Sequence, residues 1–539
     1  MNEGVTIAVE VPTPLLQSVG GAAGGVLAVV LFIILWRRRR RTKTAPNGSV
    51  PWLRALIDHR RAKRHLARAA ESLSTLAAAE CRSKEDLDAR IEALLSLGSL
   101  AQDTARRGAW QVHVTVLSLL CRYVRDVAPS QSAVDFPLAP WQSLPDGATA
   151  AEKAAHLAWR EVRFANRITP NARSWAASLP PPRADVALAL RIIGRGIPDE
   201  IPDRPGAPSA GLVGNALPCP TLPDIHDRTP PTAEAIARYR TALHTWRTAR
   251  AAAEGFRPDL RRTNLQAADL SGLGLSGCRL DGARLEGAQL CATRLDGASL
   301  RDARLDGADL TAARLPGADL RRASLEAAVL RGAQMQGARL RKARMEWVNA
   351  KQARLDGANL HEARLEVASF YQASLIGAVF YKATMDGAVL RGARLDGADF
   401  TRARLPWANL RNARLDHAAL CWAALEDADL SEAVLDGADL FKARLDRADL
   451  RRTHLTGVIL SKAGTAGHVS LNDAIFQQTV LGRIDLGTVT ITQSQIDQCL
   501  GDASVVLPEG IAAPDHWSRQ VAPTDPPEHP AALVTIRQA

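Results

Sequence analysis

Large apolar residues recur at every fifth position from Leu265 to Leu460. Of the 40 positions in this series, 39 hold Leu, Met or Phe, and only Ala350 departs from the rule. Ala stands two residues before nearly all of them, so that Ala303 to Leu310 reads Ala-Arg-Leu-Asp-Gly-Ala-Asp-Leu. An α-helix would spread these side chains around its axis, and a straight strand would send alternate ones to opposite faces. They all point inward only if the chain turns a corner every five residues.

This pattern predicts stacked coils of short strands around a filled interior. Ala and the central Leu point inward, the residue between them points outward, and the remaining two residues, often Asp-Gly, form the corner. One coil cannot bury its inner row alone, so the coils must stack through backbone hydrogen bonds. Where the central residue shrinks to Ala350, its inward neighbour grows to Val348, which keeps the packed volume nearly constant. The predicted core includes Leu305, Leu355, Phe380, Phe400, Val348 and Ala350.

The repeat resembles that of the pentapeptide-repeat family, whose consensus is Ala-(Asp/Asn)-Leu-x-x. The resemblance implies a right-handed quadrilateral parallel β-helix with four pentads per coil. Forty pentads would then give about ten coils and a rod roughly 48 Å long, too narrow inside for a ligand cavity. Phe380 and Phe400 would lie one coil apart and should stack on the same side.

The outward residues follow a pattern of their own. The residue before the central Leu alternates between Arg, as at Arg304, and Asp or another polar residue, as at Asp309. On the coil geometry each row of arginines is paired with acids two residues further on. Such acids are Asp296, Asp306, Asp356 and Asp396. Because the pairs neutralise the repulsion between like charges, we expect a mixed and solvated wall.

The N-terminal part carries a different pattern, a run of 22 residues without a charge from Leu15 to Trp36. As a helix it would measure about 33 Å, enough to cross a bilayer. Only the acids Glu3 and Glu10 precede it and a basic block follows, which is the reverse of a cleaved secretory signal. The positive-inside rule therefore predicts a single-pass anchor with the N-terminus outside and the rest in the cytoplasm. The alternative is an apolar tail buried in an oligomer.

Two features of this region predict contacts within or at the bilayer. Small residues at G-x-x-x-G spacing, Gly20, Gly21, Gly24 and Gly25, would let two helices pack closely as a homodimer, although glycine-rich membrane helices are common. The basic block would contact anionic lipid headgroups. It consists of Arg37, Arg38, Arg39, Arg40, Arg41 and Lys43.

Charge and cysteine usage narrow the function classes. Residues 37–68 hold 12 Lys and Arg against one acid, a local excess equal to the +11 of the whole chain, whereas residues 263–462 hold 29 basic and 25 acidic residues. The basicity is therefore local, and a nucleic-acid-binding face spread over a domain is not expected. The seven cysteines are scattered without C-x-x-C, which argues against a disulfide framework or a zinc site and fits a reducing compartment.

Helical periodicity fills the middle of the chain. It extends from Trp52 to Arg125, and further helices are predicted at Trp110 to Val127, Glu152 to Ile168, Ala184 to Ile193 and from Thr232 to about Glu254. The nine prolines in residues 197–232 indicate a linker. After Leu460 the five-residue register is expected to fade. Thr492 and Gln495 have capping-box spacing, and Gly501 could close a short helix that covers the last coil.

The middle and the C-terminal end are similar to those of a group of bacterial membrane-anchored pentapeptide-repeat proteins. The similarity covers Leu94 to Pro129, Asp185 to Gly194 and Leu486 to Trp517. It implies a location in the bacterial cell (inner) membrane but no activity. The predicted segments are an extracytoplasmic N-terminus (1–14), a membrane span (15–36), a basic segment (37–51), a helical section (52–196), a linker (197–231), a leading helix (232–256), the β-helix (257–490), a cap (491–517) and a loose tail (518–539).

No catalytic motif stands out. Gly272 to Gly277 spells G-x-G-x-x-G, but it lies within the five-residue register with no helix after it. We therefore predict no catalytic, cofactor-binding or metal-binding residues, and a non-enzymatic scaffold that binds an unidentified protein partner. The family resemblance offers one alternative, because some pentapeptide-repeat proteins imitate DNA and bind topoisomerases. An enzyme within residues 52–196 and direct DNA binding by residues 37–68 receive less support.

Overall fold

The computed structural model describes residues 83–106, 109–136, 172–197, 219–220, 231–252, 256–461 and 469–517, with isolated positions at 67, 71, 149 and 151. Within these ranges, no helix combines the length and the apolar character that crossing a bilayer requires. The predicted membrane span at 15–36, its basic flank and the predicted helix at 152–168 lie outside the described residues.

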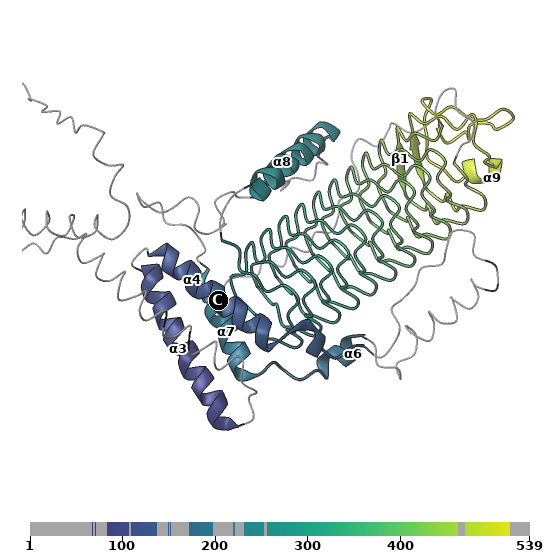
Figure 1. Ribbon diagram of the computed structural model, residues 1–539. Coiled ribbons are helices and arrows are strands. Elements are labelled where there is room, and N and C mark those ends of the chain that lie inside the picture. Colours follow the sequence, from purple (N-terminus) through teal and green to yellow (C-terminus); the bar gives the residue numbers. More distant parts are fainter. Residues whose placement is uncertain are drawn as a thin grey trace, which may run out of the picture. The chain divides into compact units, whose positions relative to one another are not determined.

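The repeats form a right-handed parallel β-helix, visible as the stacked coils in Figure 1. Single-residue bridges join successive coils with a step of 20 residues, as from Arg284 to Arg304 and from Arg304 to Ser324. Four pentads therefore complete one coil, as the family resemblance implied. Each rung is held by the backbone: the N–H of Leu285 donates to the carbonyl of Arg304 at 2.7 Å, and the N–H of Arg304 donates to the carbonyl of Ala283 at 2.9 Å.

The corners are tight turns closed by one hydrogen bond. The carbonyl of Leu305 accepts a bond from the N–H of Ala308 at 3.0 Å, and the same bond recurs along the rod. The second corner residue has a positive φ, 66° at Gly307 and 57° at Asp302. Glycine adopts this conformation readily, whereas a side chain there costs about 1 kcal/mol or more. Corners that read Asp-Gly are therefore the least strained.

The interior is the predicted column of Ala and Leu side chains. All six predicted core residues have 0 or 1% of their surface exposed: Leu305, Leu355, Phe380, Phe400, Val348 and Ala350. The rings of Phe380 and Phe400 stack with centroids 4.7 Å apart and planes within 2° of parallel, which confirms their predicted placement one coil apart.

The five-residue register is interrupted after Leu460, where the sequence predicts that it fades, and coils continue through the predicted β-helix (257–490) to a bridge at Val506. The step between bridged residues rises from 20 to 26 between Arg444 and Ser470, returns to 20 between Val480 and Leu500, and is 21 between Asp485 and Val506. Strand β1 (His454–Thr456) pairs in parallel with β2 (Val480–Gly482) across this shift. An insertion between pentads thus displaces the register without ending it, and inward residues such as Phe476 stay buried.

Three helices close the first coil. Helix α3 (Lys84–Arg106), α4 (Trp110–Val127) and α7 (Ala184–Gly196) pack on one another, and α4 and α7 begin where the sequence predicted. Apolar side chains of α4 and α7, such as Leu117 and Ile193, belong to the same core as Leu260 and Leu265 of the first coil. The helical section therefore caps the open end of the interior column.

A buried polar cluster joins these helices. The hydroxyl of Tyr123 donates to Oδ2 of Asp185 at 2.6 Å, Nε of Arg183 donates to Oδ1 at 3.1 Å, and Nη1 of Arg90 lies 3.6 Å from Oδ2. Burial favours the neutral carboxylic acid, but the hydrogen bonds from Arg183 and Tyr123 outweigh it, so the pKa of Asp185 is lowered. The cluster therefore supplies hydrogen bonds and positive charge to the carboxylate of Asp185, which has no exposed surface.

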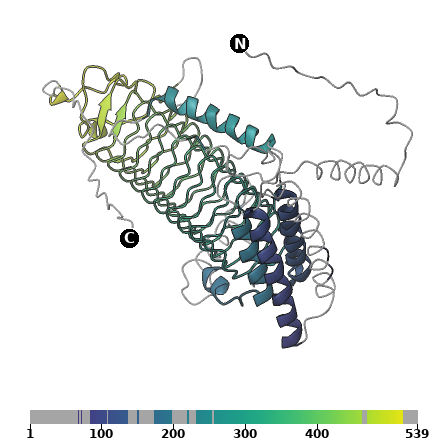
Figure 2. The same cartoon turned by 90° about the vertical axis from the view of Figure 1, so that its left-hand side faces the viewer.

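Four further helical elements complete the described chain: the long helix α8 (Ala233–Ala252) and the short η2 (Ser130–Ser132), α6 (Ala172–Ala177) and α9 (Gln493–Ile496). Figure 2 shows α8 alongside the coils. Thr492 and Gln495 form the predicted capping box of α9, but the helix ends at Ile496 and not near Gly501. Beyond α9, Nε1 of Trp517 donates a hydrogen bond to the carbonyl of Cys499 at 2.9 Å, and the indole ring thereby covers the last coils.

Candidate functional site: the arginine wall of the β-helix

The described part of the chain offers little room for chemistry. It contains no group of His, Cys, Asp or Glu side chains that could hold a metal ion. A cavity of about 230 Å³ lies where the helical section meets the first coil, and both apolar residues such as Val127 and Pro181 and polar residues such as Arg183 and Gln266 line it. Because side chains fill the interior of the rod, any binding site on the rod has to be built on its outer surface.

One face of the rod, which we call the arginine wall, carries a row of outward cations. Its outward residues are Arg284, Arg304, Ser324, Arg344, Arg364, Thr384, Arg404, Ala424 and Arg444, each bridged to the next coil. The residue after each central Leu or Met begins the corner beside this face. Most of these corner residues are acidic, and we call them the acid column: Glu286, Asp306, Glu326, Glu346, Glu366, Asp386, Glu426 and Asp446.

The arginines and the acid column form a ladder of ion pairs. Nε of Arg284 lies 2.7 Å from Glu286, and Nε of Arg304 lies 3.2 Å from the same carboxylate in the preceding coil. Arg344 contacts Glu326 at 2.9 Å in the same way. An arginine therefore reaches both the acid of its own pentad and that of the coil before it, which ties successive coils together.

The expectation of a solvated wall is wrong for the acids. Asp296, Asp306, Asp356 and Asp396 are all buried, as are Glu286 and Glu346, because the corner draws the first turn residue beneath the neighbouring arginines. Burial raises the pKa of Glu346 to about 7, although Arg364 and Arg344 oppose it. The outward surface therefore shows mainly guanidinium groups, and much of the negative charge lies underneath.

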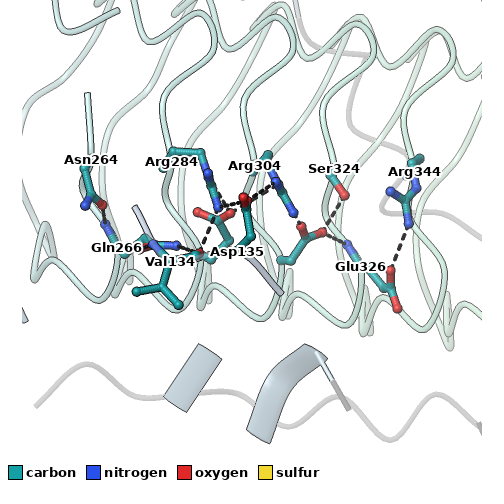
Figure 3. Close-up of polar contacts among 11 residues, drawn as sticks. Val134, Asp135, Asn264, Gln266, Arg284, Arg304, Ser324, Glu326 and Arg344 are labelled. Atoms are coloured by element: carbon teal, nitrogen blue, oxygen red, sulfur yellow. Dashed lines mark hydrogen bonds and ion pairs between the residues drawn. The ribbon is translucent and has the colours of Figure 1, made fainter. Parts of the chain in front are cut away.

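The first coils of the wall hold residues 129–136, which we call the strap. It contains the 3-10 turn η2 and continues irregularly to Phe136, and Figure 3 shows Val134 and Asp135 of this stretch. Gln266 contacts the backbone of Val134 twice, since its Oε1 accepts from the N–H at 2.9 Å and its Nε2 donates to the carbonyl at 2.7 Å. Nη2 of Arg284 donates to the same carbonyl at 2.9 Å. The carboxylate of Asp135 lies 2.9 Å from Arg284 and 3.0 Å from Arg304, so it bridges two coils.

An aromatic contact and a short helix complete this covered region. Phe136, next to Asp135, packs against Trp175 of α6 with ring centroids 5.0 Å apart. A Cβ atom at Gly287 would overlap the carbonyl of Ala176, and one at Gly307 would meet Ala172 and Ala176. Glycine in these two corners thus lets α6 lie directly on the rod.

Further along, the same wall has larger corner residues. The distal wall, as we call it, consists of Arg344, Arg364, Thr384 and Arg404 with the corner residues Trp347, Val367 and Trp407. Trp347 is 37% exposed and Trp407 is 56% exposed. The side chains of Arg344 and Arg364 retain 23% and 17% of their surface. Cationic and aromatic groups are therefore accessible side by side.

A second corner of the rod carries α8. Its second position is glycine in six successive coils, Gly297, Gly317, Gly337, Gly357, Gly377 and Gly397. Apolar side chains of α8, including Leu243 and Trp246, lie where Cβ atoms of these glycines would be. Arg240 donates to the carbonyls of Gly377 at 3.1 Å and Gly397 at 2.7 Å. This contact explains a glycine at every twentieth position.

A third surface, at another corner, combines cations with aromatic rings. Nζ of Lys442 lies 4.4 Å from the ring centroid of Trp422, and Arg402 lies 6.0 Å from it. Nζ of Lys382 lies 5.6 Å from the ring of Tyr381. These cation–π contacts hold the rings against the rod, and unlike the arginine wall this corner has no described chain segment bound to it.

The other predicted site residues lie outside the described residues. These are the glycines Gly20, Gly21, Gly24 and Gly25 and the block from Arg37 to Arg41 with Lys43. Sequence analysis missed the strap and the seat of α8. Writing the chain in rows of 20 residues would have revealed the column from Gly297 to Gly397. The pairing of residues 129–136 with coils 130 residues later leaves no local pattern.

Comparison with known proteins concerns the repeat region. The family model described as pentapeptide repeats matches in eight copies, over residues 259–297, 283–326, 308–346, 318–357, 353–392, 381–416, 389–427 and 420–457. Among solved structures, the chain is similar to HetL, a pentapeptide repeat protein involved in heterocyst differentiation regulation from the cyanobacterium Nostoc sp. strain PCC 7120. The identity is 33%, the TM-score is 0.25, and the match covers 40% of this chain and 89% of HetL.

Two other solved structures are similar over the same kind of repeat. QnrB1, a plasmid-mediated fluoroquinolone resistance protein, matches in a trypsin-treated form at 19% identity and a TM-score of 0.19, covering 35% of this chain and 90% of QnrB1. A pentapeptide repeat protein from the Arabidopsis thaliana thylakoid lumen matches at 27% identity and a TM-score of 0.12, covering 21% of this chain and 66% of its own length. The search of curated proteins gave no match.

Proposed function

We propose that this chain, which is a pentapeptide-repeat protein, is a non-enzymatic scaffold anchored in the bacterial cell membrane, whose β-helix receives a protein partner on the cytoplasmic side. The observation that carries the proposal is the arginine wall, which is covered by the strap at one end and exposes Trp347 and Trp407 further along. Because side chains fill the interior of the rod, its outer surface is the main place where it can bind a partner.

The membrane part of the proposal rests on the sequence. The uncharged run from Leu15 to Trp36 would anchor the chain, and Arg37 to Arg41 with Lys43 would contact anionic headgroups on the cytoplasmic side. The glycines between Gly20 and Gly25 would allow two anchors to pair. An anchored rod would hold its partner near the bilayer.

The alternative, a rod that mimics DNA and binds a topoisomerase, stays a prediction. Such mimicry needs an acidic outer surface, whereas here carboxylates such as Glu286, Glu346 and Asp396 are buried and arginines face outward. The surface charge therefore supports the protein scaffold better. A DNA-supercoiling assay with the full-length chain separates the two, because only the mimic would inhibit or protect a topoisomerase.

The scaffold is tested by photo-crosslinking in cells that make the full-length chain. A photoreactive amino acid replaces one exposed residue at a time, on the arginine wall (Trp407), on the cation–aromatic corner (Lys382) or on another corner (Lys351). We expect one discrete crosslinked product from one surface, recovered with the membrane fraction only while residues 15–36 are present. Absence of a product from every position, or turnover of a substrate by the purified chain, would contradict the proposal.

A further inference from the structure

Helix α8 runs along the coils (Figure 2), and a cavity of about 120 Å³, which we call the α8 cavity, lies between its C-terminal half and the rod. Arginine side chains dominate the lining: Arg247 and Arg250 of α8, Arg257, which follows the helix, and Arg301 and Arg339 of the rod. Asp319 is the one acid among the described residues that line it. The cavity is therefore small and strongly cationic.

The arginines on the helix side are held by backbone carbonyls. Nη1 of Arg247 donates to the carbonyl of Gly337 at 3.3 Å, and Nη2 of Arg250 donates to the carbonyl of Asp296 at 2.5 Å. Nη2 of Arg257 donates to the carbonyl of Arg250 at 3.3 Å. Within the described part of the chain, none of these three arginines forms an ion pair with a carboxylate. The carbonyls orient the guanidinium groups but do not neutralise them.

Burial and repulsion both act against these charges. Burial lowers the pKa of Arg247, and the nearby Arg339 of the rod lowers it further. Burial also lowers the pKa of Arg250, where Asp296 opposes the shift and Arg257 adds to it. Like charges therefore face each other where α8 meets the rod. Because buried cations in proteins are usually paired with an anion, a negative ligand in this cavity would relieve both effects.

On the rod side, a single carboxylate organises three arginines. Oδ2 of Asp319 lies 2.7 Å from Nε of Arg301, 2.8 Å from Nη2 of Arg321 and 3.9 Å from Nη1 of Arg339. Among the described residues, Asp319 is the only acceptor that the side chains of Arg301 and Arg339 contact. A guanidinium has five N–H donors, so both arginines keep donors for a ligand.

The chemistry of the cavity favours a phosphate group. Five arginines line it against one acid that is already shared, so an anion with two charges balances the excess better than a carboxylate does. A phosphate also offers several oxygens to guanidinium groups that approach from two sides, and the planar guanidinium fork matches phosphate geometry. The volume of about 120 Å³ is well below the roughly 300–1,000 Å³ of pockets for drug-sized ligands, which favours a small ligand.

We infer that the α8 cavity binds a phosphate dianion, either inorganic phosphate or the terminal phosphomonoester of a small molecule, between the arginines of the helix side and those of the rod. Because such a ligand contacts both elements, its binding should fasten the C-terminal half of α8 to the coils. This site is separate from the proposed scaffold function and does not rest on it.

Isothermal titration calorimetry on the full-length chain in detergent micelles tests this site, at pH 8 and constant ionic strength. The three titrants are inorganic phosphate, glycerol 3-phosphate and dimethyl phosphate, a diester with a single charge like the phosphates of many membrane lipids. We expect the first two to bind and dimethyl phosphate to bind at least tenfold more weakly. Tighter binding of glycerol 3-phosphate than of phosphate would identify a phosphomonoester as the ligand, and the reverse order would identify free phosphate.

Two variants remove one guanidinium from each side of the cavity. Arg257→Gln and Arg339→Gln should each weaken phosphate binding at least fivefold. Both arginines are loosely held, Arg257 at 3.3 Å from the carbonyl of Arg250 and Arg339 at 3.9 Å from Asp319, so their loss should leave the fold intact. The matched control is Arg391→Gln, which removes an exposed arginine that does not line the cavity and should leave the affinity unchanged.

Hydrogen exchange gives a second readout. Phosphate should slow amide exchange at least threefold in residues 243–252 and leave that of α3 as it is, and Arg339→Gln should abolish the slowing. Three calorimetric results would overturn the inference: no saturable binding, binding that Arg257→Gln and Arg339→Gln leave unchanged, or dimethyl phosphate binding as tightly as phosphate. The second result would place the phosphate elsewhere on the chain, and the third would indicate a site for phosphodiesters such as lipids or nucleic acids. Binding without slower exchange would overturn the link to α8.

Discussion

Nη2 of Arg364 lies 3.0 Å from Oε1 of Glu346, a carboxylate that has no exposed surface. Burial raises the pKa of Glu346 to about 7 and that of Asp396 to about 7, while neighbouring arginines counteract the shift. An arginine beside a carboxylate is therefore not sufficient evidence that ionised acids stabilise the rod. Here, desolvation outweighs the attraction of the pair.

The first prediction concerns the pH dependence of stability. In the unfolded chain the carboxyl group of Glu346 loses its proton near its ordinary pKa of 4.5, whereas in the rod the same group stays protonated until about pH 7. The free energy of unfolding should therefore fall as pH rises from 4.5 to 7, by up to about 3 kcal/mol from this group, and level off above. Glu346→Gln should reduce the fall of the melting temperature between pH 5 and 8, as measured by circular dichroism, and the remaining fall should come from groups such as Asp396, whose pKa burial also raises to about 7.

Glu432→Gln is the control for this experiment. Burial alone would raise the pKa of Glu432, but the hydrogen bond from Asn412 and the contacts with Arg411 together outweigh it and lower the pKa. The contribution of Glu432 to stability is therefore complete above its ordinary pKa. This variant should leave the slope between pH 5 and 8 as it is. A wild-type melting temperature that rises from pH 5 to 8 and a Glu346→Gln profile parallel to it would refute the prediction.

The second prediction tests the inward column. Leu355 is completely buried, and an aspartate in its place would bring an unpaired charge into the filled interior. Leu355→Asp should destabilise the rod by more than about 4 kcal/mol, which is at the upper end of single-residue effects. Leu355→Met is the control, because Met335 already occupies the same column one coil earlier and the volume is nearly kept. Thermal unfolding of both variants measures the difference, and equal melting temperatures would place Leu355 outside the core.

The third prediction concerns the helical cap. Asp185→Ala removes the carboxylate that binds Tyr123 and lies beside the buried Arg90. The loss should cost about 3–5 kcal/mol, because a buried cation loses its counter-charge, whereas Tyr123→Phe, which removes one hydrogen bond, should cost about 1 kcal/mol. Urea unfolding followed at 222 nm, where helices dominate the signal, measures both. Two variants of equal stability would show that Asp185 contributes one ordinary hydrogen bond.

The sequence predicted the parts of this fold that depend on strictly local rules. The five-residue period fixed which side chains point inward, so the stacking of Phe380 on Phe400 and the exchange of size between Val348 and Ala350 followed from close packing. The pattern also located the capping box at Thr492.

The errors have physical reasons that the pattern does not contain. An acid two residues after an arginine looks solvated in sequence, but the corner folds residues such as Asp396 under the arginines. The strap could not be predicted, because its contacts join Val134 to Gln266 and Asp135 to Arg304, which are far apart in the chain.

The last prediction concerns the seat of α8 on the glycine corner. Gly317 has a φ of 62°, and a Cβ atom there would overlap the ring of Trp246. Gly317→Ala should displace α8, which would appear as faster amide exchange in residues 233–252 and a red-shifted tryptophan emission. Its cost should be about 1 kcal/mol for the backbone conformation plus about 1–3 kcal/mol for the overlap.

Gly332→Ala separates the cost of the backbone conformation from the cost of the overlap with α8. Gly332 has nearly the same φ, 65°, but a Cβ atom there would meet no atom within 4 Å. This variant should therefore lose only about 1 kcal/mol and leave the exchange of α8 unchanged. If Gly332→Ala loosened α8 as much as Gly317→Ala does, the effect would come from strain in the coil. The glycine column would then serve the turns of the rod and not the docking of the helix.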